Sequence, residues 1–456
     1  MTNEERVYKD YFGEVRIPAG KKWGKTTQRS YENFLINDEL MPRETVYSLA
    51  LVKKAMAQAN AEVGELDQDK ADLIGKVVDE IVEGDHDEQF PLKVWQTGSG
   101  TQTNMNVNEV IAFVANEKAG EEVIHPNDHV NMGQSTNCTF PTAMQVAASV
   151  TIDRKLMPAL EKTKETLKNL SGKYKDTIKN GRTHLQDATP VTFGQEVYGW
   201  YGLVDEAQKQ IEATLSFMYN LPLGGTAVGT GLNCHPDVPE IAIGLLAEWT
   251  GLDFTESDNK FHGLTTKDQF AFTSGALTSL AGNLMKIGND VRWLASGPRS
   301  GLGEIEIPAN EPGSSIMPGK VNPTQVEALT MVAVQVMGND TAIKVASSQG
   351  NFELNVFMPV ISLNMQQSIN LLADSIVSFN ERCLEGIEAN EEQMDKLVED
   401  SLMLVTALSP HIGYDKATAI ANKAHEEGTT LREAALDLGY VTEEEYNEYV
   451  RPEKMV

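Results

Sequence analysis

The sequence predicts a mainly helical protein built around a bundle of long helices. Two stretches of the chain place apolar residues at alternating intervals of three and four. The first stretch comprises Val197, Trp200, Val204, Ala207 and Ile211, and the second comprises Leu277, Leu280, Leu284, Ile287, Val291 and Leu294. Such spacing over three or more turns is typical of helices that pack side by side at shallow angles. Segments 146–174, 326–345 and 354–379 also follow helical patterns, so about five long helices are expected.

Changes in these patterns divide the chain into three predicted domains. Residues 1–135 mix short helical patterns with turns rich in Gly and Asn, which predicts a mixed, mostly helical N-terminal domain. Residues 136–390 contain the long helices of the central bundle, and residues 391–456 form a small helical C-terminal domain. Because the bundle helices have apolar residues on more than one face, we expect an oligomer. A monomer whose end domains cover these faces is the alternative.

The C-terminal domain has clear signals for the beginnings and ends of helices. Thr430 and Thr442 each precede a glutamate by three residues, which is the capping-box pattern at a helix start. Gly428 and Gly439 stand where helices are expected to end. The region should therefore consist of short helices.

Composition and charge exclude several classes of protein. The net charge of −28 offers no basic surface for a nucleic acid. No apolar run approaches the roughly 20 residues of a membrane span, and the polar N-terminus resembles neither a signal nor a transit peptide. The three cysteines, Cys138, Cys234 and Cys383, are odd in number and far apart, which favours reduced thiols in a cytoplasmic protein. A small anion would need a local group of cations in this acidic molecule.

Residues 311–323 are the most informative segment for function. Three prolines and two glycines rule out regular structure there, although the segment joins two helical patterns. Long irregular loops in compact proteins are often binding loops. Ser314 and Ser315 supply hydroxyls, Lys320 an ammonium and Asn322 a carboxamide, all suited to holding a carboxylate. An anion-binding loop is therefore favoured over the alternative, a surface loop.

This loop, Gly-Ser-Ser-Ile-Met-Pro-Gly-Lys-Val-Asn-Pro, closely resembles the signature loop of the fumarase/aspartase superfamily. Segments 94–106, 125–137 and 181–190 resemble further family regions, in the same order, so the likeness covers almost the whole chain. Within the superfamily the chain is most similar to the metal-independent class II fumarases. Their pattern has Pro-Gly-Lys in the loop and Thr-Gln-x-Glu after it, whereas aspartases usually carry Ala before the lysine.

The resemblance implies a role for each of five residues. Ser314 matches the catalytic base that removes a proton next to a carboxylate, and Lys320 and Asn322 match the groups that hold the carboxylate receiving the charge. His184 matches the second acid/base group, which acts on water, and Glu327 matches its carboxylate partner. A lone histidine is more often structural. The matched segment around His184 favours the catalytic interpretation.

Other polar residues match groups that bind the substrate or a second anion. Their alternative interpretation is helix capping or turn formation, which is common for these residue types. The residues that would hold a dicarboxylate are Ser99, Thr101, Ser135, Thr136, Asn137, Thr183, Ser315 and Asn322. The secondary anion site would comprise His125, Asn127 and Asp128. A metal pair of His125 and His129 is disfavoured, because Pro126 makes a helix there unexpected.

The resemblance implies reversible hydration of fumarate to (S)-malate through an aci-carboxylate intermediate, a step of the tricarboxylic acid cycle. It implies no metal, no organic cofactor, and a homotetramer with shared active sites. Aspartate ammonia-lyase activity and an inactive structural member are the alternatives. One residue departs from the family pattern: Cys138 follows Ser135–Asn137, where the family usually has Asp. The glycine-rich segment 224–231 lacks the features of a phosphate loop, so a tight loop near the active site is expected.

Overall fold

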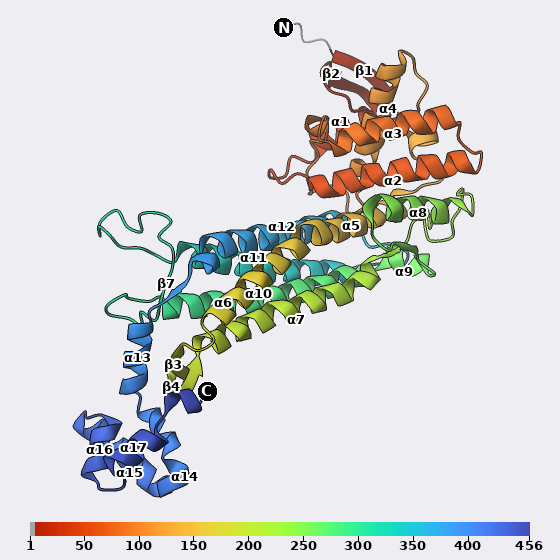
Figure 1. Ribbon diagram of the computed structural model, residues 1–456. Helices are drawn as coiled ribbons and strands as arrows, with labels where there is room; N and C mark the ends of the chain where they lie inside the picture. Colours follow the sequence, from red (N-terminus) through yellow and green to blue (C-terminus); the bar gives the residue numbers. More distant parts are fainter. Residues whose placement is uncertain (1–4) are drawn as a thin grey trace. The chain divides into compact units, whose positions relative to one another are not determined.

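The computed structural model describes residues 5–456, and it is mainly helical, as the sequence predicts (Figure 1). Its residues group into two compact units, each built from three stretches of the chain. The first unit comprises the chain up to Pro158, Ala207–Ala281 and Ala333–Ala373, and the second comprises Ala159–Glu206, Gly282–Val332 and Asp374–Val456. The unit boundaries fall inside long helices and coincide with neither 135 nor 390. The division into three domains therefore stays a prediction.

The first unit is organised around α2, a helix whose buried side points to several neighbours at once. Residues Val46, Leu49, Val52 and Met56 of α2 are almost completely buried. The helix packs against α3, α5 and α8. The elements are β1 (Glu5–Asp10), β2 (Gly13–Pro18), α1 (Lys25–Asn33), α2 (Arg43–Glu62), α3 (Gln68–Val82), α4 (Thr101–Ala119), α5 (Thr136–Thr151), α8 (Val238–Thr250) and α9 (Lys260–Thr265). Strands β1 and β2 pair antiparallel, and β5 (Asn220–Leu221) pairs parallel with β6 (Thr255–Glu256).

The expected long helices are present. They are α5, which continues through a π-helical turn at Ile152–Leu156 into α6 (Met157–Lys173), α7 (Phe193–Met218), α10 (Asp268–Leu294), α11 (Thr324–Ser347) and α12 (Met358–Arg382). Every residue of the two apolar series in α7 and α10 is buried, which confirms those patterns. Helix α12 begins at Met358 instead of 354, because Asn351 and Leu354 pair with each other and the Asn355 side chain accepts the Phe357 N–H.

Polar contacts join the long helices within each unit. In the first unit Ser274 of α10 donates to Asp340 of α11 (2.8 Å), and Asn339 of α11 donates to Ser368 of α12 (3.1 Å). In the second unit the Trp200 indole of α7 donates to Asp290 of α10 (2.9 Å). The long helices therefore pack against one another in both units.

The second unit also contains a β-hairpin and the C-terminal helices. Strands β3 (Ile178–Thr183) and β4 (Gln186–Thr192) pair antiparallel, as do β7 (Ile305–Glu306) and β8 (Glu388–Ala389). The C-terminal helices are α13 (Glu391–Asp400), α14 (Ser409–Ile412), α15 (Tyr414–Glu427), α16 (Leu431–Asp437) and α17 (Glu443–Tyr449). Thr430 and Thr442 form the two expected capping boxes, and Gly428 and Gly439 follow helices with positive φ. These short helices share a core around Leu408, Ile420 and Leu431.

Candidate functional site

The loop at residues 313–322 is closed by its own hydrogen bonds. The Gly313 N–H donates to the Lys320 carbonyl (2.9 Å), and the Asn322 carboxamide donates to the Gly313 carbonyl (2.6 Å). Within this ring the Ser314 Oγ accepts the backbone N–H groups of Ile316 (3.2 Å) and Met317 (3.0 Å). Two N–H groups aimed at one oxygen favour negative charge on it. The loop thus has the donors that would stabilise a Ser314 alkoxide.

Glycine is required at position 313 by close packing of backbone. A Cβ atom there would lie 2.3 Å from the Lys320 carbonyl oxygen and 2.9 Å from the Asn322 nitrogen. Because both neighbours are backbone atoms, they could not move aside without opening the loop. The first glycine of the motif therefore allows the two ends of the loop to approach each other closely.

The end of this loop lines a cavity of about 720 Å³ in the second unit. Lys320, Asn322 and Arg292 contribute polar groups, and Trp293 and Ile307 contribute apolar surface. Lys320 is exposed, and its ammonium has no ion-pair partner among residues 5–456. An unpaired cation on a loop closed by hydrogen bonds is suited to binding a carboxylate.

His184 lies at the tip of the β3–β4 hairpin. It forms a two-residue turn with Leu185, and both residues have positive φ angles, 58° and 59°. This is the sign pattern of a type I′ turn, which usually contains Asn or Gly because other side chains are strained there by about 1–2 kcal/mol each. Strain of this kind is common at functional sites. The turn exposes both side chains, and 67% of the Leu185 surface is accessible.

Buried charges anchor the hairpin. The Arg182 guanidinium makes two hydrogen bonds to the Glu304 carboxylate, at 2.7 and 3.3 Å. Lys179 is buried with its Nζ 3.7 Å from Glu304 and 3.1 Å from Glu196. Burial raises the pKa of the Glu196 carboxyl. Because Glu304 directly precedes β7, the cluster ties the His184 hairpin to the segment that leads into the 313–322 loop.

The structure does not join His184 to Glu327 within one chain. Glu327 lies in the first turn of α11 and is exposed, as are His184 and Thr183. In the part of the chain that the structure describes, neither the His184 ring nor the Glu327 carboxylate makes a hydrogen bond or an ion pair. The partnership of these two residues stays a prediction.

In the first unit, Ser99 and Thr101 lie together at the beginning of α4. Their hydroxyl oxygens are 2.9 Å apart, and Thr101 is the first helical residue. Gly98 lets the Val356 carbonyl approach the backbone next to Ser99, since a Cβ atom at position 98 would lie 1.4 Å from the carbonyl oxygen. The preceding Gly100 packs against the Phe140 ring of α5. The N-terminal ends of α4 and α5 are therefore neighbours.

Ser135, Thr136 and Asn137 begin helix α5. The Ser135 Oγ caps the helix by accepting the Asn137 N–H (3.2 Å), and Thr136 is buried. The Asn137 carboxamide donates to the carbonyl of Ala227 (2.7 Å), which lies in the glycine-rich loop. The glycine-rich loop thus contacts Asn137, a residue predicted to bind the substrate. Two adjacent helix N-termini offer free N–H groups and positive dipole ends to an anion.

The segment at His125 forms a helical turn, so the expectation that Pro126 would prevent one is wrong. Residues Pro126–Val130 make a π turn with the proline at its first position, where a backbone N–H has no helical partner to lose. The His125 Nδ1 accepts the Asp128 N–H (3.1 Å), and the His129 Nδ1 accepts the His125 N–H (2.9 Å). Asn127 is exposed beside them. No group of three or more metal-ligating side chains occurs within residues 5–456.

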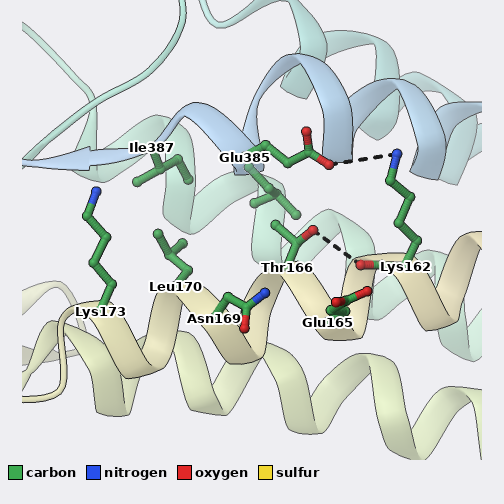
Figure 2. Close-up of a pocket in the computed structure, with 9 residues that line it drawn as sticks. Lys162, Glu165, Thr166, Asn169, Leu170, Lys173, Glu385 and Ile387 are labelled. Carbon is green, nitrogen blue, oxygen red and sulfur yellow. Dashed lines mark hydrogen bonds and ion pairs between the residues drawn. The ribbon is translucent and has the colours of Figure 1, made fainter.

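A second cavity, of about 420 Å³, lies between α6 and the segment 384–387 that follows α12, and none of the predicted site residues lines it (Figure 2). Its two lysines already have acidic partners. Lys162 pairs with Glu381 (2.6 Å) and Glu385 (3.8 Å), and Lys173 pairs with Glu388 (2.7 Å). This cavity is therefore less suited to an anion than the Lys320 loop.

Among the described helices, none is long and apolar enough to span a membrane.

Sequence reasoning missed the anchoring residues Lys179, Glu196 and Glu304. Arg182 lies inside segment 181–190, which resembles a family region. Because a partly buried arginine needs an acidic partner, a carboxylate near Arg182 could have been predicted. Nothing in the sequence pointed to Glu304, which is 122 positions away.

Comparisons with known proteins identify the family. Residues 13–338 match the family model described as Lyase, and residues 404–456 match the one described as Fumarase C C-terminus. The chain is 56% identical over 457 residues to the class II fumarate hydratase of Bacillus cereus and 55% identical over 457 residues to that of Bacillus subtilis, with 99% of each chain covered. The crystal structure of class II fumarase from Schistosoma mansoni matches with a TM-score of 0.97 at 41% identity, again over 99% of both chains. The chain therefore belongs to the class II fumarate hydratase family.

Proposed function

We propose that this protein catalyses the reversible hydration of fumarate to (S)-malate with Ser314 as the catalytic base. The observation that carries this proposal is the pair of N–H groups that point at the Ser314 Oγ inside a closed loop. A serine hydroxyl is a weak base, so it needs such stabilisation before it can remove a proton from carbon.

In the malate-to-fumarate direction, Ser314 removes the proton next to a carboxylate, and the electron pair spreads into that carboxylate to give a dianionic aci form. Lys320 and Asn322 hold this carboxylate, and their effect is largest where its charge is largest. His184, with Glu327 as its partner, acts through a water molecule and assists departure of the hydroxide. The reverse sequence adds water to fumarate.

The other predicted residues position the dicarboxylate. Ser99, Thr101, Ser135, Thr136 and Asn137 lie at two neighbouring helix N-termini, which suit a carboxylate group. Thr183 and Ser315 flank the two proposed catalytic residues in sequence. The exposed turn at His125, Asn127 and Asp128 is the proposed secondary anion site.

We also propose a homotetramer in which neighbouring subunits share active sites. His184 and Glu327 are exposed and unpaired within the described chain, which is expected if each meets groups of another subunit. Large apolar side chains are exposed on the long helices, namely Tyr198, Phe217, Phe272, Trp293, Met331, Val334 and Val345. Exposed apolar surface of this extent is typical of a protein interface. Analytical ultracentrifugation should give four times the chain mass, and a monomer would contradict the proposal.

The ultraviolet absorbance of fumarate provides the main test of activity. Purified protein supplied with malate should produce fumarate without added metal or organic cofactor, and aspartate should remain unchanged. Release of ammonia from aspartate, with malate inert, would favour the ammonia-lyase alternative. Inertness toward both substrates would favour the inactive structural member.

A further inference from the structure

Lys53 is a fully buried lysine in the middle of α2. It occupies a core position of that helix, because Val46, Leu49, Lys53, Met56 and Asn60 follow the same spacing of three and four. All five side chains are buried. A charged group at such a position is expensive unless it has partners, so its surroundings indicate its role.

Amide oxygens surround the Lys53 ammonium. Its Nζ donates to the Asn131 Oδ1 and to the Gln134 Oε1, both at 2.8 Å. Asn131 also accepts from the carboxamides of Asn104 and Asn108 of α4, each at 3.2 Å. Residues 131–134 link the His125 turn to the substrate segment that begins at Ser135. Lys53 is therefore at the centre of the hydrogen bonds that shape this link.

The Lys53 ammonium has no carboxylate partner. Among residues 5–456, no acidic side chain lies within ion-pair distance of the Lys53 Nζ. Besides burial, the cause that acts on the pKa of Lys53 is the thiol of Cys138 on α5, which favours the charged form. Helix α4 and the 131–134 link present amides to it. The buried Cys138 thiol donates to the Ser135 carbonyl (3.3 Å), directly beneath the substrate segment.

Burial without a counter-ion disfavours the charged form of the amine. It lowers the pKa of Lys53 from 10.5 to about 7. An aspartate at position 138 would favour the charged form and raise that pKa.

We propose that Lys53 is a positioning residue for the dicarboxylate and that the absence of a carboxylate at position 138 leaves its charge without a counter-ion and therefore dependent on pH. The inference rests on the proposed function, in which Ser135–Asn137 hold the substrate. Loss of the Lys53 proton removes a positive charge from the 131–134 link, which leads into that segment, and weakens two charge-assisted hydrogen bonds. Binding of a dianion should therefore weaken as pH rises.

Succinate binding to the full-length protein, measured by calorimetry from pH 6.5 to 9.5, tests this inference. Succinate stays a dianion above about pH 6.5, so a change in affinity reports on the protein. The dissociation constant of the parent should rise roughly tenfold over this range. In Cys138→Asp the midpoint of the rise should move upward by at least about one pH unit, whereas Cys138→Asn should keep the parental midpoint.

If the dissociation constant for succinate depended on pH in the same way in Cys138→Asp and Cys138→Asn, the inference would be overturned. If Cys138→Asp does not fold, Lys53→Gln provides the second test. This variant should bind succinate weakly at every pH. If its dissociation constant rose with pH as much as that of the parent, the inference would be overturned as well. Calorimetry needs no turnover, so this result is separate from the malate assay that tests the proposed function.

Discussion

The Gly313–Asn322 loop and the β3–β4 hairpin carry the two halves of the proposed chemistry, and they are held in place in different ways. Backbone hydrogen bonds close the loop on itself, and its serine receives N–H groups from within the same ten residues. The hairpin is strained at its tip and depends on buried charges outside itself, chiefly Glu304. A substitution in the loop should therefore affect chemistry first, whereas a substitution at the base of the hairpin should affect stability first.

The largest effect is expected for Ser314→Ala. Removal of the proposed base should lower kcat by about 10³–10⁴-fold. Folding should be unchanged, because the hydroxyl only accepts hydrogen bonds from exposed backbone. Turnover of malate and circular dichroism would be measured, with Ser300→Ala as the control in a nearby exposed loop. Turnover of Ser314→Ala near the parental level would contradict its role.

His184→Asn should have the next largest effect, a fall in kcat of about 10²-fold. Because the histidine acts on water and not on the carboxylates, KM should change by less than about threefold. Steady-state kinetics would separate the two parameters, and His425→Asn, an exposed histidine in α15, is the matched control. A rise in KM with an unchanged kcat would assign His184 to substrate binding instead.

Glu304→Gln tests the anchoring of the hairpin. The change removes the carboxylate shared by Arg182 and Lys179, and loss of one partner from a buried ion cluster costs about 3–5 kcal/mol. The free energy of unfolding in urea should fall by that amount. Glu306→Gln, the same change at an exposed position of β7, should alter it by less than about 0.5 kcal/mol. Equal stabilities of the two variants would show that the cluster does not anchor the hairpin.

Leu185→Asn should have the smallest effect and the opposite sign. Asparagine tolerates positive φ better than leucine, so the free energy of unfolding should rise by up to about 1 kcal/mol. Leu185→Ala keeps the strain and should give no such gain. If Leu185→Asn were the less stable of the two, the exposed leucine side chain, and not its backbone, would determine stability at the tip.

Features that depend on a local pattern of residues could be predicted from the sequence. The apolar spacing in α7 and α10 located buried faces, and the capping boxes located two short C-terminal helices. The irregular composition of residues 311–323 indicated a loop whose hydroxyls, ammonium and carboxamide could serve binding. Proline at 126 was misjudged, because its effect depends on its position within the turn.

Features that depend on distant residues could not be derived in the same way. The pairing of Arg182 with Glu304 joins positions 122 apart, and no local pattern specifies which of the many acidic residues a buried arginine meets. Lys53 is an intermediate case. Its place in an apolar series predicts burial, whereas its amide partners at 131 and 134 become apparent only in three dimensions.

The hairpin also shares its base with the C-terminal helices, and this has a consequence for local unfolding. Ile178, the first residue of β3, packs against the C-terminal core, and the two strands contact α13 and the segment at 402–407. Segments that share a core tend to open as one cooperative unit. Amide hydrogen exchange in β3 and β4 should therefore rise and fall together with that of α15. Proteolytic loss of the last few dozen residues would then leave the His184 turn unsupported, even though every residue of the turn is intact.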